Sequence, residues 1–136
     1  MLVITAFTSL LFAIPAALLK CRIASSLFAI IVPVSFAVHA FGGRCWAVGD
    51  TETGRALVLA DKALAQSAAA ATIIRVVRVA HVDNAVYCAL FFASVGAVFF
   101  LYYVFYPKPP RCWVAHHAAF HLIAVQGTLF AYMCGA

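Results

Sequence analysis

The sequence predicts an all-helical bundle of membrane-spanning segments, in a single domain that covers residues 1–136. Of the 136 residues, 67% are hydrophobic and only 10% are charged, and the mean hydropathy is +1.07. A soluble domain of this length has no core large enough to bury so much apolar surface. The apolar residues also gather into segments of about 20 residues, which is the length that a helix needs to cross a bilayer. These observations predict an integral membrane protein.

Five apolar segments follow one another along the chain, and we interpret each as a transmembrane helix: roughly 2–19, 23–43, 56–80, 84–106 and 112–134. Lys20 and Arg22 separate the first two segments. The glycines and acidic residues within 43–55 are typical of a water-exposed connection. The prolines within 106–113 end the fourth segment, because proline cannot continue a helix.

The third segment is more polar than the others, since it contains Asp61, Lys62 and Gln66. Its middle, SAAAATII, is rich in small residues, which favour close packing between helices over contact with lipid. We therefore expect this segment to be buried within the bundle.

The net charge of +5 is spread thinly, without a run of lysines or arginines. Nucleic-acid binding needs a concentrated basic face, so this class of function is excluded, and we expect the basic residues to contact membrane lipids instead. Among the cysteines, Cys45 and Cys112 are expected at span ends on the same side of the membrane. They are either joined by a disulfide or serve as small apolar fillers.

The segment HHAAFH at 116–121 holds three of the five histidines within an apolar span. His117 and His121 are one helical turn apart, so both imidazoles can reach a single metal ion. Polar side chains inside a membrane are costly unless they have partners, and hydrogen bonds to neighbouring helices are the alternative explanation. His116 points about 100° away from His117 and is expected to contact headgroups or to support the site.

Counting residues from the span ends places further polar residues at the same depth. His39 lies four residues before the end of the second span, and Asp61 and His117 lie five residues into the third and fifth spans. With a rise of about 1.5 Å per residue, these side chains are about 6–8 Å below the same membrane surface. Ser35 and His121 are each one turn deeper. We expect all five residues to converge in one layer.

Three imidazoles and a water molecule form a tetrahedral zinc site with one open position. A carboxylate at Asp61 could accept a proton from the water, and the Ser35 hydroxyl could orient that water or stabilise an oxyanion. Two simpler roles remain open: an ion pair between Asp61 and Lys62, and a hydrogen bond from Ser35 to its own helix.

The order of these residues resembles the CREST superfamily, which includes alkaline ceramidases and adiponectin–progestin type receptors. The matching elements are S-x-x-x-H at Ser35 and His39, an aspartate near the start of the next span, and H-x-x-x-H in the last span. The stretch HHAAFHLIAVQG is similar to the final-span motif of alkaline ceramidases. The resemblance implies that His39, His117 and His121 bind Zn²⁺, with Asp61 and Ser35 as the assisting catalytic pair.

The superfamily has seven spans, whereas this chain offers about five, so a shortened CREST-like bundle is expected. Spans that would enclose a lipid substrate are then missing. We therefore expect an accessory subunit of a larger membrane protein complex, with the zinc centre retained for structure, in the mitochondrial inner membrane. The alternative is a ceramidase-like zinc hydrolase of lipid amides or esters in the endoplasmic reticulum or Golgi.

Overall fold

The structure is a computed structural model that describes residues 2–41, 52–105 and 113–135, and within these ranges the regular secondary structure is all helical, with no strand. The elements in chain order are α1 (Leu2–Leu10), α2 (Ala13–Leu18), α3 (Arg22–Phe41), α4 (Glu52–Val79), the short 3₁₀ helix η2 (Val82–Asn84), α5 (Ala85–Phe105) and α6 (Trp113–Gly135). The predicted all-helical class is confirmed for the described residues.

Four of the expected spans are helices long and apolar enough to cross a membrane: Arg22–Ala40, Glu52–Val79, Val82–Tyr103 and Val114–Gly135. By length and composition, these helices indicate an integral membrane protein. The predicted connections at 43–55 and 106–113, together with Cys45 and Cys112, lie mostly or wholly outside the described residues.

The first expected span, 2–19, differs from the prediction because it is broken into α1 and α2. Pro15 has no backbone N–H, so it cannot bond to the carbonyl of Leu11 as a continuous helix requires. Ile14 bonds to that carbonyl instead, at 3.0 Å, and the chain passes through a tight turn between the two helices. The apolar helical stretch Ile4–Leu18, which includes this turn, is shorter than the other four.

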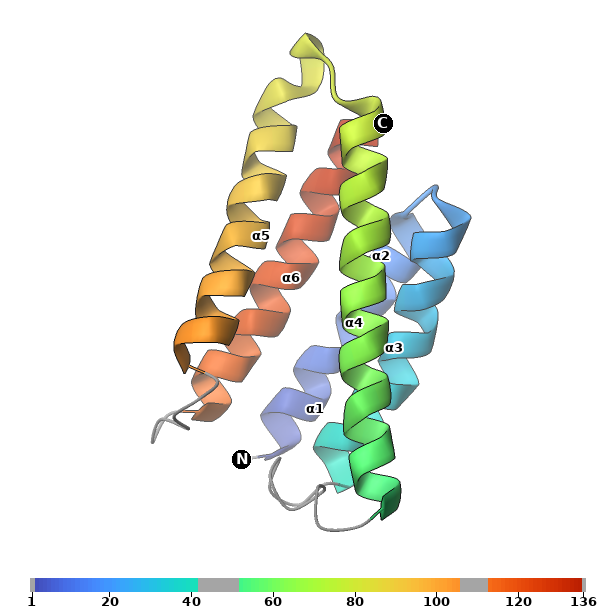
Figure 1. Ribbon diagram of the computed structural model, residues 1–136, viewed down its shortest axis with the longest axis vertical. Helices are drawn as coiled ribbons and strands as arrows, with labels where there is room; N and C mark the ends of the chain where they lie inside the picture. The colour runs from blue at the N-terminus through green and yellow to red at the C-terminus, as the bar shows by residue number, and fades with distance from the viewer. Residues whose placement is uncertain (1, 42–51, 106–112, 136) are drawn as a thin grey trace.

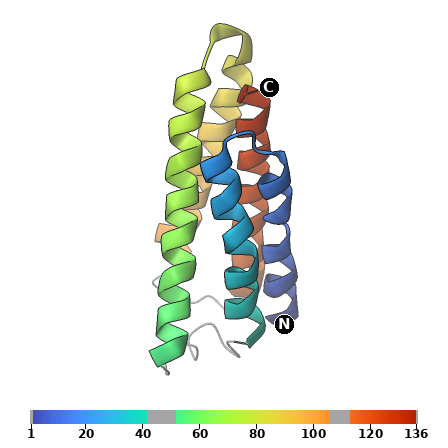
Figure 2. The same ribbon diagram turned by 90° about the vertical axis from the view of Figure 1, so that its right-hand side faces the viewer.

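The long helices stand roughly parallel to one another, with consecutive ones running in opposite directions (Figures 1 and 2). α6 lies in the middle and packs against α1, α2, α4 and α5, while α3 packs against α1, α2 and α4. α5 packs chiefly on α6. Among the described residues, the backbones of α3 and α6 are not closely packed against each other. Contacts between these two helices are therefore made by side chains that reach across the space between them.

Two apolar clusters hold the bundle together, and α4 contributes a residue to each. The first joins the α1–α2 turn to α3, α4 and α6, and consists of Phe12, Phe28, Ile31, Ala68 and Val125. The second joins α4, α5 and α6, and consists of Val76, Cys88, Phe91, Ala131 and Cys134. In the α5–α6 contact, a Cβ atom added to Gly127 would lie 2.9 Å from the Cβ atom of Ser94, so glycine is required for this close approach.

The expectation that the 56–80 segment is buried within the bundle is wrong for this chain alone. Only 11% of the residues across the membrane-length part of α4 are buried, against 33% in α3 and α6. Gln66, Ser67, Ala69 and Ala70 are all exposed. Small residues allow close packing but do not specify the partner, and here only Ala68 of the SAAAA stretch packs into the protein's own core while its neighbours face away from it.

Candidate metal centre

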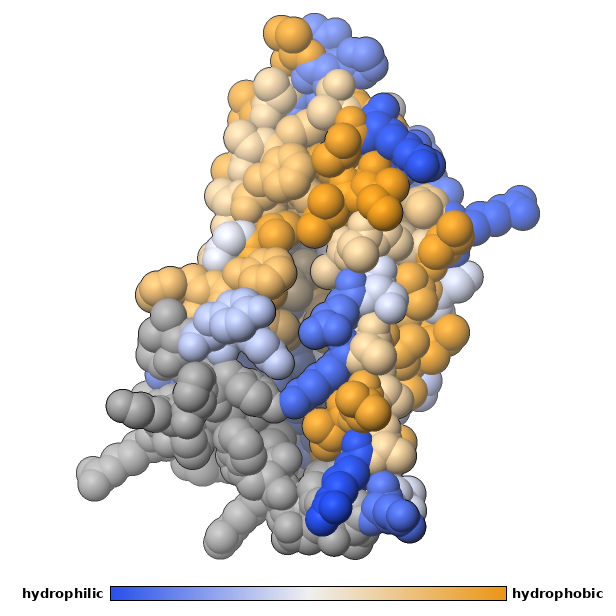
Figure 3. All heavy atoms as spheres, in the orientation of Figure 1, coloured by the Kyte–Doolittle hydropathy of each residue, from blue (hydrophilic) through white to orange (hydrophobic). Residues whose placement is uncertain are grey.

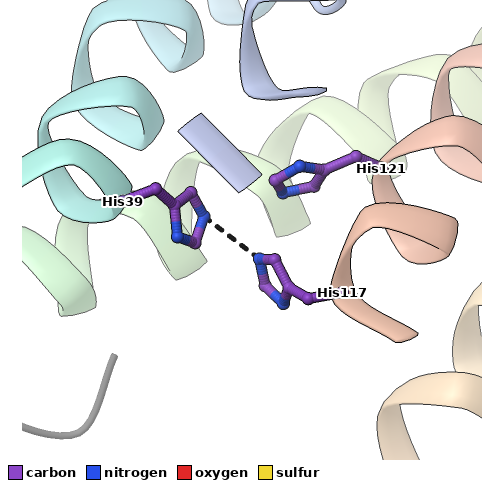
Figure 4. Close-up of side chains that lie close together, drawn as sticks. All are labelled: His39, His117 and His121. Carbon is purple, nitrogen blue, oxygen red and sulfur yellow. Dashed lines mark hydrogen bonds between the residues drawn. The ribbon is translucent and has the colours of Figure 1, made fainter. Parts of the chain in front are cut away.

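Three histidines meet near one end of the bundle, between α3 and α6. One ring nitrogen from each of His39, His117 and His121 lies within 4.8 Å of the other two. Figure 4 shows the three imidazoles pointing towards one another, His39 from α3 and the other two from successive turns of α6. The structure therefore brings together the three residues that the sequence pattern predicts as metal ligands.

The local helical geometry explains this arrangement. His117 and His121 are four residues apart in α6, so their side chains emerge from the same face, and their ring centroids are 4.5 Å apart. His39 crosses from α3, with its ring centroid 4.6 Å from that of His117 and 5.2 Å from that of His121. His39 and His121 are each only 3% exposed, so the group is enclosed by helices.

The distances fit a tetrahedral metal ion. With Zn–N bonds of 2.0–2.1 Å, two ligand nitrogens in such a site are about 3.3–3.4 Å apart. The Nε2 atoms of His39 and His117 are 3.1 Å apart, which is close to this value. The third nitrogen needs to move by no more than about 1.5 Å to complete the set. Imidazole nitrogens suit zinc, copper, iron and nickel, so these three histidines could hold a metal ion.

A hydroxyl group in α1 fixes the orientation of the His121 ring. Thr8 Oγ1 lies 2.9 Å from His121 Nδ1, and it also donates a hydrogen bond of 3.0 Å to the carbonyl of Thr5. Because a hydroxyl has one proton, Thr8 accepts the bond from His121 Nδ1–H. This tautomer leaves the lone pair on Nε2, the nitrogen that a metal ion would bind.

Phe12 packs against the same histidine on its apolar side. The Phe12 and His121 rings meet edge to face, with centroids 5.3 Å apart, and Phe12 also stacks on Phe28 in the core. The His121 ring is therefore held by a hydrogen bond on one side and by apolar packing on another, which restricts its rotation.

Ser35 and Asp61 form a second polar contact next to the histidines. Ser35 is one turn from His39 in α3 and is 2% exposed, and its side chain is hydrogen-bonded to the Asp61 carboxyl group in α4. Lys62 lies close enough to interact with the same carboxyl group. Ser35 therefore makes a contact between helices and not the expected alternative, a hydrogen bond within its own helix. The other alternative, an electrostatic interaction between Asp61 and Lys62, is present as well.

The remaining histidines take no part in the three-histidine group. His116 is half-buried beside it. His81 is exposed at the opposite end of the bundle, where it precedes η2.

The contacts of His121 with Thr8 and Phe12 were not predicted from the sequence. Thr8 is six residues into the first span, so the same depth counting that grouped the histidines would have placed it in their layer.

Comparisons with known protein families, with curated proteins and with solved structures find no match to this chain. The resemblance to the CREST superfamily stays a prediction from the order of residues in the sequence.

Proposed function

We propose that this membrane protein binds Zn²⁺ through His39, His117 and His121, and that it serves as an accessory subunit of a larger membrane assembly in which the zinc has a structural role. The observation that carries the proposal is the convergence of the three imidazoles within 4.8 Å. Three nitrogen ligands and one open position suit zinc, and the CREST-like order of these residues favours the same ion.

The position of the site supports a structural role for the metal. The backbones of α3 and α6 are not closely packed among the described residues, and the histidines cross the space between these two helices. Metal binding free energy acts as folding free energy when the ligands come from separate elements. A zinc ion here would hold α3 against α6 and would stabilise the bundle as a whole.

The exposed face of α4 supports the subunit role. Gln66 and Ser67 lie near the middle of a membrane-length helix and are exposed, next to the small residues Ala69 and Ala70. Figure 3 shows hydrophilic side chains along the face of the molecule where α4 lies. Polar side chains facing lipid are costly, whereas small and polar residues together favour packing against another helix. A partner subunit would bury this face of α4, which the protein's own helices leave exposed.

The finer fold that we propose is a shortened CREST-like bundle of five spans, with the α1–α2 segment as the first. Four helices have the length of a span, and α1–α2 contributes Thr8 to the metal centre from inside the bundle. The mitochondrial inner membrane, which is rich in multisubunit assemblies, is the proposed location.

Metal analysis of the purified protein tests the zinc centre. We expect one zinc per chain, loss of most of this zinc in His117→Ala, and wild-type zinc content in His116→Ala, because the neighbouring histidine is outside the group. A strong chelator should lower the Tm of the wild-type protein in detergent and leave that of His117→Ala unchanged. A wild-type protein without bound metal, or equal zinc content in both variants, contradicts the proposal.

A second candidate function, a zinc-dependent hydrolase of lipid amides or esters, is favoured by the Ser35–Asp61 contact. Zinc, when bound, would supply a Lewis acid and a water molecule of lowered pKa. Asp61 would accept a proton from this water, and Ser35 would hold the carboxyl group in place. This candidate ranks second because a five-span bundle lacks spans that would enclose a lipid substrate. Two concavities among the described residues lie at the other end of the bundle, with no histidine of the centre in their walls.

Asp61→Asn separates the two functions. In a hydrolase, we expect this variant to keep its zinc and to lose hydrolysis of a long-chain ceramide by about 10²–10⁴-fold, the usual contribution of a general base. In a structural site, the wild-type protein releases no fatty acid from ceramide vesicles, and the variant retains wild-type zinc. Turnover of ceramide by the purified wild-type chain would reverse the ranking.

A further inference from the structure

A pair of cysteines lies at the other end of the bundle from the histidines, outside the proposed metal centre. Cys88 is in the first turns of α5 and Cys134 is near the end of α6. Their Sγ atoms are 3.1 Å apart. The two residues are 7% and 4% exposed and belong to the apolar cluster that joins α4, α5 and α6.

The separation of the two sulfurs distinguishes between a metal site and a disulfide. Two thiolates that share a tetrahedral zinc ion, with Zn–S bonds of about 2.3 Å, are about 3.8 Å apart. The observed 3.1 Å is shorter than this, and one further ångström of approach reaches the 2.03–2.05 Å of an S–S bond. The geometry therefore favours covalent pairing of Cys88 with Cys134 over metal binding.

Asn84 holds the surrounding backbone in place. Its Nδ2 donates hydrogen bonds to the carbonyl oxygens of Val79, at 2.9 Å, and of Cys134, at 2.7 Å. Its Oδ1 accepts a bond of 2.7 Å from the backbone N–H of His81 and lies 3.4 Å from Cys88 Sγ. One side chain thus joins the end of α4, the start of α5 and the end of α6, so both cysteines are positioned by the same residue.

Only one residue of the pair borders an open concavity among those described. Cys88 forms part of an open concavity together with Ala80, His81, Val82 and Ala85. Cys134 is not among the residues that form this concavity, so a reagent that enters it meets Cys88 first. This asymmetry gives the two cysteines different parts in an exchange reaction.

We infer that Cys88 and Cys134 form a thiol oxidation site, at which a small-molecule disulfide converts the pair into an intramolecular disulfide. The Cys88 thiolate attacks one sulfur of the disulfide R–S–S–R, which forms a mixed disulfide and releases one RS⁻. Cys134 loses its proton and attacks the Cys88 sulfur, which forms the Cys88–Cys134 bond and releases the second RS⁻. The two cysteines lose two electrons, and the two released thiolates take up the two protons.

Oxidation at this site ties the start of α5 to the end of α6. α5 packs chiefly on α6 and has few other neighbours in the described bundle. A covalent bond there restricts separation of these two helices in the unfolded chain and stabilises the folded protein.

The experiment uses the full chain with Cys21, Cys45 and Cys112 replaced by serine, so that only the pair remains. The reduced protein is titrated with oxidised glutathione, quenched with acid, unfolded and alkylated, and its peptides are analysed by mass spectrometry. We expect a species that has lost two hydrogen atoms and contains a Cys88–Cys134 linked peptide. Its Tm in detergent should be higher than that of the reduced form.

Two single variants in the same background complete the test. With Cys134→Ser, we expect the reaction to stop at the glutathione mixed disulfide on Cys88; with Cys88→Ser, we expect Cys134 to react much more slowly. Two results would overturn the inference. In the first, both cysteines are still alkylated after treatment at a glutathione redox potential that oxidises an ordinary structural dithiol. In the second, Cys88 stays glutathionylated even though Cys134 is present. If the serine background fails to fold, the same peptide analysis on the unsubstituted chain gives the same two answers. None of these readouts depends on zinc.

Discussion

The Thr8 hydroxyl determines which nitrogen of His121 carries the proton. It donates to the Thr5 carbonyl and accepts from His121 Nδ1, so the lone pair that a metal ion would bind is on Nε2. Hydrogen bonds of this kind raise the basicity of a ligating imidazole and hold the ring in its binding orientation.

Replacing this hydroxyl should weaken metal binding without removing a ligand. We expect Thr8→Val, which keeps the shape of the side chain, to lower zinc affinity by about 10–100-fold, the usual effect of losing such a partner. Competition with a chromogenic chelator measures the change. Thr72→Val is the matched control, because Thr72 is also a helical threonine but bonds only to the carbonyl of Ala68 in its own helix. Equal affinity in the two variants would show that Thr8 does not orient the ligand.

The histidines could be predicted from the sequence because their spacing has a direct geometric meaning. A separation of four residues puts His117 and His121 on one face of a helix, and counting from the span ends put His39 at their depth. Thr8 could not be singled out in the same way, because a threonine in an apolar helix often bonds only to its own backbone. Its hydrogen bond to His121 depends on how α1 packs against α6, which spacing along the chain does not encode.

At the scale of helices, α5 and α6 approach each other closely at Gly127. An added Cβ atom there would lie 2.9 Å from Ser94 Cβ, whereas one added at Gly96 of α5 would meet nothing within 4 Å. The two glycines thus have opposite roles: one permits contact between helices, and the other only lowers the intrinsic stability of its helix.

Substitution with alanine should separate these two roles. We expect Gly127→Ala to lower the free energy of unfolding by about 1–3 kcal/mol, because the helices must move apart. Gly96→Ala should leave stability unchanged or raise it by up to about 1 kcal/mol through better helix propensity. Titration of the helical signal with a denaturing detergent compares the two variants. A loss of stability in Gly96→Ala as large as that in Gly127→Ala would contradict this explanation.

Two element predictions failed, for identifiable reasons. The 2–19 segment was expected to be one helix, but Pro15 removes the N–H that would continue it beyond the α1–α2 turn. The 56–80 segment was expected to be buried in the bundle, but α4 lies at its edge. Composition indicates that a helix needs packing partners; it does not indicate whether they belong to the same chain.

On the scale of the whole molecule, α4 is an exposed membrane-length helix that carries more polar side chains than the apolar faces beside it, which lipid can cover. If a partner subunit packs on α4, a large side chain introduced into this helix should displace the partner. We expect Ala69→Trp to abolish co-purification of the partner chains in mild detergent. Ala93→Trp, which changes an exposed alanine of α5, should leave co-purification intact. Retention of the same chains by both variants would place the interface elsewhere, and a wild-type protein that purifies alone would argue against a subunit role.

The histidine contact between α3 and α6 joins residues 78 positions apart in the chain. During synthesis the helix that carries His39 emerges before the one that carries His117 and His121. A metal ion cannot find its full set of ligands until α6 has been inserted beside α3. Metal loading would therefore report that these two helices have come together, since a chain that stalls before α6 has only one of the three imidazoles to offer.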